Sequence, residues 1–371
     1  MPSSQRDLLR GLLRRPQGAT TLTISDWDLV VRQARRAGLL ARLACCLEEE
    51  QLLSAVPAEP RRHLEAEQAV ARKLSHDVRR EVRRIAAALA GLETPIVLLK
   101  GAAYVMAGLP AAAGRLFNDI DIMVPRERLD AVETALRAAG WVAGDIDPYD
   151  ERYYRRWMHQ IPPLTHGTRG TTVDTHHTIV ARTTRLELRA SKLFAAAVPL
   201  ASDPALSILA PADMVLHSAT HLLNEGDFDR GLRDLDDLHR LMRHFGRDPA
   251  FWETLVARAA ELDLRRPLFY ALRYCRELLG TPVPERIAAA SALQPPGPLL
   301  SALMDPLFER ALRPSHASCR DGLSGIALFV LYIRAHWMLM PVRILVPHLL
   351  RKAVMRWRGA EAEPAAPEPQ H

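Results

Sequence analysis

Residues 95–124 constrain the fold of this chain more than any other stretch. An apolar run at residues 96–99 is long enough for a buried strand, and Lys100 and Gly101 end it. A short helix-permissive stretch and a Gly/Pro/Ala-rich connection follow, and residues 119–124 then read DIDIMV. This order predicts two buried strands joined by a short helix.

The second of these strands carries two carboxylates on one side. Because strand side chains alternate, Asp119 and Asp121 share a face about 6.5–7 Å apart along the backbone, while Ile120 and Ile122 enter the core. Two like charges held close together repel unless a cation lies between them or one takes up a proton. Oxygen ligands suit Mg²⁺, which also binds water and substrate phosphates. The alternative is an ordinary exposed strand, on which the same alternation also occurs.

The order of these motifs resembles a known fold. Strand, Lys-Gly, helix, Arg115, Asp-Ile-Asp and a helix ending at Gly140 are similar to the nucleotidyltransferase core of the DNA polymerase beta-like superfamily. The similarity is greatest to a bacterial group, the uncharacterised nucleotidyltransferase family, in which the pattern LKG…R…DIDLLV…GY recurs. It covers most of the chain between about residues 85 and 242.

The resemblance implies roles for several residues. Gly101 falls on the turn that approaches the triphosphate in that superfamily, and Asp119 and Asp121 fall on the pair that holds the divalent metals. Asp174, in the run TVDTH at residues 172–176, matches an acidic residue on a later strand. That residue completes the metal site or activates the attacking hydroxyl. All three carboxylates are therefore expected at one metal site.

From these matches we expect a metal-dependent nucleotidyltransferase. It would bind an NTP, such as ATP, with the phosphates near Gly101 and with Lys100 and Arg115 neutralising their charge; the metal would be Mg²⁺ or Mn²⁺. The NMP would pass to a hydroxyl or amine of a small molecule, a sugar, a protein or RNA. Two alternatives are a non-catalytic nucleotide- or partner-binding protein with the same fold and a toxin-like nucleotidyltransferase that modifies tRNA.

Several histidines accompany these motifs. His176 shares a strand face with Asp174 and is a substrate contact, a proton acceptor or a packing residue, whereas His177 faces the other way. His159 lies where the family resemblance continues beyond the acidic strand, and it is a candidate substrate-binding residue. These assignments place His159 and His176 near the reacting groups.

A second histidine pair suggests a different class of enzyme. His217 and His221 are four residues apart on an expected helix, so they share one face. The spacing resembles that of zinc hydrolases, but Ser218 stands where the glutamate of that motif is expected. A zinc site formed with Asp174 or His176 is therefore a minor alternative, and packing or a substrate-side role is favoured.

Composition predicts a mostly helical chain, and the resemblance implies an α+β protein with a small mixed β-sheet nucleotidyltransferase core embedded in helices. Aromatic residues make up 6% of the chain, and Ala, Leu and Arg outnumber β-branched runs. The net charge of +6 permits anionic partners but is spread over many helices. The expected regions are N-terminal helices at 1–84, the core at 85–200, C-terminal helices at 205–358 and a disordered tail at 359–371.

Compartment signals favour the cytoplasm. The four cysteines show no metal-ligand spacing, and residues 1–20 do not form a basic and then apolar leader. The apolar run at 325–350 is interrupted by Arg334, His336 and Arg343, so a spanning helix is not expected. Residues 325–358 could lie on an anionic membrane surface, but packing against other helices is favoured.

Four local predictions complete this interpretation. We expect a helix N-cap at Ser25, with helical structure from there to about Glu50. We expect a short edge strand at 161–164 and a proline-rich linker at Pro199, Pro204 and Pro211. The Tyr- and Arg-rich segment 147–157 could stack on a base and bind phosphate, although a segment that covers the sheet is favoured.

Overall fold

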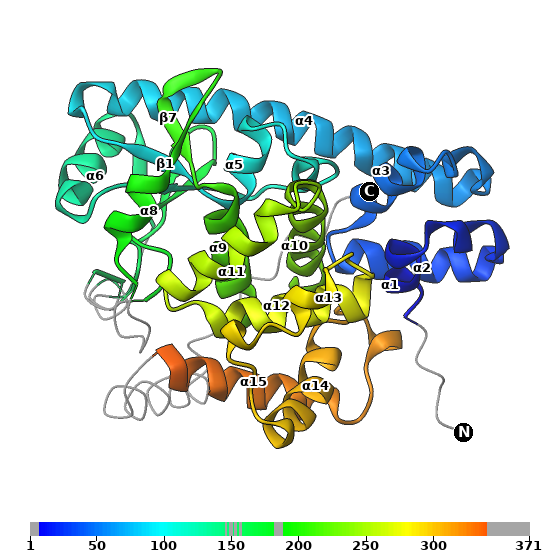
Figure 1. Cartoon of the computed structure of the whole chain (residues 1–371). Helices are drawn as coiled ribbons and strands as arrows, with labels where there is room; N and C mark the ends of the chain where they lie inside the picture. Colours follow the sequence, from blue (N-terminus) through cyan, green and yellow to red (C-terminus); the bar gives the residue numbers. More distant parts are fainter. Residues whose placement is uncertain are drawn as a thin grey trace.

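The computed structural model describes residues 7–144, 147, 151, 154–155, 158–181 and 188–339. The expected α+β class is confirmed, because a seven-stranded mixed sheet lies among many helices. In Figure 1 the N-terminal helices lie on the right, the sheet lies on the left, and the last two helices lie below. The long helix α4 runs across the top and links the two sides.

The N-terminal region consists of helices. They are α1 (Leu8–Arg14), α2 (Ile24–Arg36), α3 (Leu40–Glu49) and α4 (Ala58–Leu89). The N-cap predicted at Ser25 is wrong, because Thr23 caps α2. The Thr23 hydroxyl accepts a hydrogen bond from the Asp26 amide, and the Asp26 carboxylate accepts one from the Thr23 amide. The helix predicted to continue to Glu50 breaks at Gly38, whose φ of +65° favours glycine.

The sheet has the order β3-β4-β5-β2-β1-β7-β6. Its strands are β1 (Ile96–Leu98), β2 (Asp119–Met123), β3 (Trp141–Ala143), β4 (Leu164–His166), β5 (Thr172–His176), β6 (Val198–Leu200) and β7 (Asp203–Ile208). β1 pairs antiparallel with β2 and parallel with β7, while β2 pairs parallel with β5. The strand with the acidic run therefore lies in the middle of the sheet.

Short connections hold the central strands in place. Helix α5 (Lys100–Met106) follows β1, and helix α6 (Leu129–Ala138) follows β2. Ile120 and Ile122 are buried, as their alternation with the carboxylates predicts. Gly140 ends α6 with a φ of +98°, which confirms the predicted glycine stop. The strand-helix-strand order predicted for residues 95–124 is thus confirmed.

Two predictions about the sheet are wrong. The edge strand predicted at 161–164 begins only at its last residue, and β4 lies inside the sheet between β3 and β5. Pro162 and Pro163 have no amide donor, so they precede the strand. The linker predicted around Pro199 and Pro204 is instead the hairpin of β6 and β7, and β7 pairs with β1. The division into regions ending at 84, 200 and 358 stays a prediction.

The helices after β5 pack on one side of the sheet and below it. They are α8 (Ala190–Ala196), α9 (Pro211–Asn224), α10 (Gly231–Phe245), α11 (Ala250–Glu261), α12 (Arg265–Leu279), α13 (Glu285–Ala288), α14 (Pro298–Ala311) and α15 (Ser324–Leu339). Short 3₁₀ segments occur at Pro16–Thr21, Leu53–Ala55, Ala90–Leu92, Pro110–Ala112, Arg126–Arg128, Ser291–Leu293 and Ala317–Cys319. Almost all of α9 is buried, because α10, α11 and α12 surround it.

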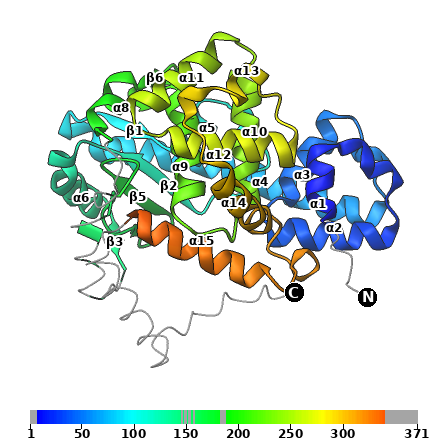
Figure 2. The ribbon, with the colours of Figure 1, turned by 60° about the horizontal axis from the view of Figure 1, so that its bottom comes forward.

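Helix α15 is the last described element, and it packs against α14 and α9. Figure 2 shows it extended along the molecule. Its buried face contains Ala327, Leu331 and Ala335, whereas Phe329 and Trp337 are exposed. No helix in the described ranges is both long enough and apolar enough to cross a membrane. Membrane contact through 325–358 stays a prediction, and most of the segment 147–157 lies outside the described residues.

Candidate functional site

The centre of the candidate site is a carboxylate pair on neighbouring strands. β2 and β5 run parallel in a register that sets Asp121 beside Asp174. His176 lies two residues beyond Asp174, on the same face of β5. Ligand atoms of Asp121, Asp174 and His176 all lie within 4.8 Å of one another. Three potential metal ligands from two strands therefore converge.

Asp121 is the most enclosed member of this group. One of its oxygens accepts hydrogen bonds from Lys100 Nζ at 3.2 Å and from His176 Nε2 at 2.9 Å. Burial opposes its ionisation, but the charge of Lys100 and the hydrogen bond from His176 hold the pKa of Asp121 below its usual range. The carboxylate is therefore ionised near neutral pH.

Lys100 reaches Asp121 from the first residue of α5. Burial alone would lower the pKa of Lys100, but the charges of Asp121, Glu225 and Asp119 raise it above the ordinary value. Its backbone has a φ of +43°, an uncommon conformation for a residue with a side chain. Such conformations persist where the surrounding structure holds them, and they cluster at functional sites.

Asp174 has a different electrostatic environment from Asp121. Burial, together with the charges of Asp121 and Asp119, raises the pKa of Asp174 to about 7. Its Oδ1 is buried and has no hydrogen-bond partner within the described residues. An unpaired buried carboxylate oxygen costs free energy unless it binds a proton or a cation. The group thus fits a divalent metal, which would satisfy this oxygen and offset the crowded negative charge.

Asp119 lies outside the close group. It is exposed at the start of β2, opposite Thr172 of β5. Partial enclosure of its carboxyl group and the charge of Asp121 raise the pKa of Asp119. It contributes to the field at Asp174, but its assignment as a metal ligand stays a prediction. The structure therefore distinguishes two carboxylates that strand alternation alone made equivalent.

His159 and His176 lie together. Their rings stack, with centroids 5.1 Å apart and an angle of 23° between planes. Burial lowers the pKa of both histidines, so they are neutral near pH 7. Nδ1 of each ring is buried without a hydrogen-bond partner in the described part of the chain. His177 lies apart from them and lines a separate cavity.

The zinc alternative receives no support from the histidines of α9. His217 is buried, and burial together with the charge of Lys100 lowers its pKa well below the ordinary value. His221 Nε2 lies 3.1 Å from a carboxylate oxygen of Glu225. Neither histidine belongs to the group of potential metal ligands found among the described residues, which consists of Asp121, Asp174 and His176. We assign both to the helical wall beside the site.

A small cavity of about 100 Å³ adjoins the carboxylates. Predicted site residues line it from the sheet side: Lys100, Gly101, Arg115, Asp119 and Asp121. The opposite wall comes from α9, where a packing or substrate-side role was expected, from α10 and from the residue just before α10: Ser218, His221, Arg230, Arg233, Asp234 and Asp237. The sequence signal was only the helical periodicity, which does not state where α9 and α10 pack.

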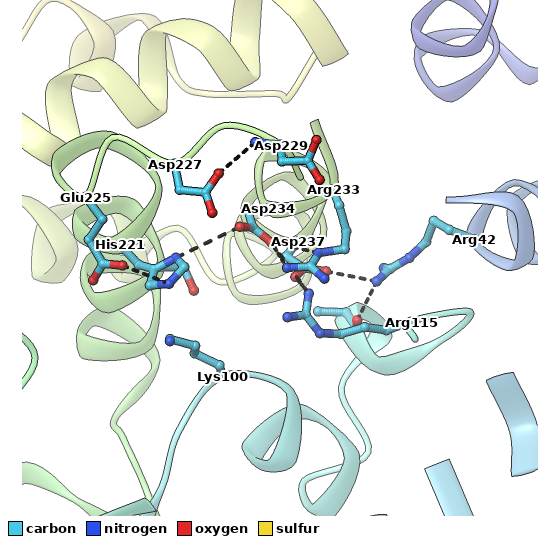
Figure 3. Close-up of polar contacts among 12 residues, drawn as sticks. Arg42, Lys100, Arg115, His221, Glu225, Asp227, Asp229, Arg233, Asp234 and Asp237 are labelled. Atoms are coloured by element: carbon cyan, nitrogen blue, oxygen red, sulfur yellow. Dashed lines mark hydrogen bonds and ion pairs between the residues drawn. The ribbon is translucent and has the colours of Figure 1, made fainter. Parts of the chain in front are cut away.

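Arg115 is bound to this helical wall. Figure 3 shows it pointing at Asp237, with which it forms an ion pair; Asp234 lies 3.9 Å away. Burial and the neighbouring charge of Arg233 lower the pKa of Arg115 to about 10, so the guanidinium keeps its charge. Arg42 pairs with the other oxygen of Asp237 at 2.8 Å. Arg115 is therefore partly neutralised before any phosphate arrives.

Gly101 has a packing reason to be glycine. A Cβ atom there would lie 2.8 Å from Cδ1 of Phe117 and 3.1 Å from Nε of Arg115. A side chain at this position would therefore displace the aromatic ring or the guanidinium. The close approach expected to a triphosphate stays a prediction, because the same glycine already accommodates Phe117.

The raised pKa of Asp174 predicts how stability depends on pH and metal. Since the pKa in the folded chain exceeds the unfolded value, ionisation of Asp174 removes stability as the pH rises from about 4 through 7. We expect Asp174→Asn to be more stable than the intact chain by about 2 kcal/mol at pH 8 without metal, and by less at pH 4. Mn²⁺ should stabilise the intact chain at pH 8 but not Asp174→Asn.

Thermal unfolding at pH 4 and pH 8, with EDTA or Mn²⁺, measures these differences. Asp130→Asn is the matched control, because Asp130 is exposed on α6 and does not belong to the close group. Equal stability of Asp174→Asn and the intact chain at pH 8 would contradict the assigned environment of Asp174.

The fold and the group together define a class: an α+β protein whose central strands carry a carboxylate-rich group with metal-ligand geometry beside a cavity lined by cations. The family described as uncharacterised nucleotidyltransferase matches residues 24–280 of the chain. The chain belongs to this family of nucleotidyltransferases. Comparison with curated proteins and with solved structures found no match.

Proposed function

We propose that this protein is a metal-dependent nucleotidyltransferase that moves an NMP from an NTP to a hydroxyl or amine acceptor. The observation that carries the proposal is the register of β2 and β5, which brings Asp121 and Asp174 together beside a cavity lined by Lys100 and other cations. Carboxylates next to cations suit a metal-bound triphosphate, in which both signs of charge need partners.

Asp119, Asp121 and Asp174 would hold Mg²⁺ or Mn²⁺. His176 would either complete the ligand group or orient Asp121 through its hydrogen bond to that carboxylate. The bound metal would supply positive charge at the triphosphate and polarise the reacting oxygens. His159, stacked on His176, would limit water access on that side and contact the substrate.

The cations around the cavity would take different parts. Lys100 already offsets the charge of Asp121 and would extend that positive field to the phosphates near Gly101. Arg115 is held by Asp237, so its main part would be to position the cavity wall. Arg230 and Arg233 line the same cavity and would supply further charge.

The transfer itself needs positioning more than covalent chemistry from the protein. The acceptor oxygen or nitrogen bonds to the α-phosphorus, the bond from that phosphorus to pyrophosphate breaks, and the acceptor proton passes to Asp174 or to water. Holding acceptor and α-phosphate in line would supply much of the rate enhancement. The proposal also includes a small molecule, a sugar, a protein or RNA as the acceptor, and a location in the cytoplasm.

The main rival is a non-catalytic nucleotide-binding protein with the same fold. The presence of Asp119, Asp121 and Asp174 together counts against it, because the crowded carboxylates carry a cost that binding a metal offsets. The tRNA-modifying alternative is favoured by one observation, a cluster of arginines beside the cavity.

Calorimetric titration of ATP, GTP, CTP and UTP, each with Mg²⁺ or Mn²⁺, tests the proposal. The intact chain is compared with Asp119→Asn/Asp121→Asn and with Asp130→Asn as the control. We expect metal-dependent binding of at least one NTP that the double variant loses and the control keeps. Absence of NTP binding with either metal would overturn the donor assignment and leave a protein that has only the fold.

A further inference from the structure

A second, larger cavity with a volume of about 600 Å³ lies next to the candidate site. Arginines from two separate regions converge on it, because α2 and α10, with the residue just before it, form its walls. We call it the arginine cavity and define it by its basic residues: Arg32, Arg35, Arg36, Arg230, Arg233 and His316. Convergence of like charges from distant parts of the sequence is unfavourable unless an anion offsets it.

Carboxylates pair with Arg32, Arg36 and Arg233 but leave the other two arginines of the cavity unpaired among the described residues. Asp229 is the acidic residue that lines the cavity, and it lies 3.8 Å from Arg36. Arg35 contacts His63 Nδ1 at 3.0 Å, and Arg230 hydrogen-bonds with the amide of Asn118. Neither of these two guanidiniums forms an ion pair with a carboxylate in the described part of the chain. Arg233 pairs with Asp234 at 2.8 Å, so the unbalanced positive charge of the cavity is that of Arg35 and Arg230.

Two neighbouring groups limit the charge of the cavity without closing it. Burial and the charges of Arg32 and Arg36 lower the pKa of His316, so His316 is neutral near pH 7 and adds no proton of its own. Arg32 pairs with Asp28 at 2.6 Å, but both side chains are largely exposed to solvent, so the guanidinium stays accessible and the pair is easily exchanged for another anion. An entering anion would meet accessible guanidinium groups.

The arginine cavity adjoins the small cavity beside the carboxylates. Both are lined by Leu116, Asn118, Arg230 and Arg233, which form their common wall. Figure 3 shows Arg233 and Asp234 at this wall, above Lys100 and Arg115. Arg233 is close enough to Asp119 to affect its pKa. A ligand in the arginine cavity would therefore lie next to a nucleotide held at the metal group.

We propose that the arginine cavity binds phosphate groups of the acceptor, so that the acceptor is a phosphate-bearing molecule. Guanidinium groups bind phosphate through paired hydrogen bonds, and five of them line this cavity. The identification of the ligand as an acceptor rests on the proposed nucleotidyltransferase function, but the existence of the anion site does not depend on that function.

The position of the arginines favours the acceptor over the donor as the ligand of the arginine cavity. Arg32, Arg35 and Arg36 line the arginine cavity but not the small cavity beside Asp119 and Asp121. A donor triphosphate must lie against the metal carboxylates, where Lys100 is also found. The three arginines of α2 are thus on the side from which a second substrate would approach.

Binding of two phosphate probes, inorganic pyrophosphate and a single-stranded RNA 12-mer, tests the site. Both titrations use the full chain in EDTA, so that metal-dependent donor binding does not contribute. The test variant is Arg32→Gln/Arg35→Gln, and the control is Arg72→Gln/Arg83→Gln, which removes the same charge from exposed positions on α4. Both pairs of arginines are exposed, so neither variant should unfold the chain.

We expect the test variant to bind at least one probe about 10-fold more weakly and to lower the salt dependence of log K by about one for each arginine that contacts phosphate. The control should change binding less than about twofold. RNA binding alone would identify a nucleic-acid acceptor, and pyrophosphate binding would identify a small phosphorylated one. Equal losses in both variants, or no binding of either probe to the intact chain, would overturn the proposal.

Titration of the same variants with NTP and Mn²⁺ separates this inference from the proposed function. Arg32→Gln/Arg35→Gln should bind the NTP as the intact chain does. Loss of NTP binding in this variant would mean that the arginines hold the donor, which contradicts the acceptor assignment. Absence of NTP binding in the intact chain would remove the proposed function while the EDTA titrations still decide whether the anion site exists.

Discussion

Asp121→Asn is expected to weaken Mn²⁺ binding by at least about 100-fold, whereas Asp119→Asn should weaken it only about 10-fold. Asp121 is buried and belongs to the close group with Asp174 and His176, while Asp119 is exposed and lies outside it. Loss of Asp121 also leaves Lys100 without its nearest counter-charge, so its ammonium group would repel an entering cation.

Calorimetric titration with Mn²⁺ at pH 8 measures this asymmetry, because Asp174 is mostly ionised there. Asp130→Asn should bind Mn²⁺ as the intact chain does. Equal losses in Asp119→Asn and Asp121→Asn would contradict the asymmetry. The metal would then bind between the two carboxylates of β2, as strand alternation alone predicts.

Arg42→Met is expected to destabilise the chain by about 3 kcal/mol. Arg42 is fully buried, lies 3.4 Å from Asp236 and 2.8 Å from Asp237, and donates to the carbonyl of Ala111 at 2.7 Å. Removing one member of a buried ion-pair network costs about 3–5 kcal/mol. The lower end applies here, because Asp236 keeps Arg240 and Asp237 keeps Arg115.

Urea denaturation of Arg42→Met and Arg32→Met tests this expectation. Arg32 forms an exposed pair with Asp28, so its loss should cost less than about 0.5 kcal/mol. A similar midpoint for the two variants would mean that the contact of α3 with α10 does not hold the N-terminal helices to the core. Arg42→Met should also free one oxygen of Asp237, the residue that holds Arg115.

The acidic strand was predictable because its information is local. Alternation of Asp119 and Asp121 with Ile120 and Ile122 depends only on the period of a strand, and the structure buries both isoleucines as expected. Likewise, Gly140 ends a helix because its positive φ suits glycine whatever surrounds it. The resemblance to nucleotidyltransferases was carried by the same local motifs, and the family match agrees with it.

Proline positions were harder to interpret. Pro199 and Pro204 favoured a linker by composition, yet they belong to the hairpin β6–β7 at the edge of the sheet. A proline lacks a donor, but Pro199 lies on the edge strand β6, which needs donors on only one of its sides, and Pro204 precedes the residues of β7 that pair with β1. Which strand lies at the edge depends on the sheet order, and sequence alone does not contain that order.

The sequence by itself determined the α+β class, the acidic strand with its two buried isoleucines and the glycine that ends α6. Tertiary structure decided which carboxylates meet, because the register of β2 against β5 sets Asp121 beside Asp174 and leaves Asp119 outside. It also decided that the wall of the site comes from α9 and α10, and that arginines of α2 reach the same place. Periodicity states which face of a helix is apolar, but packing between distant elements selects the partner of that face.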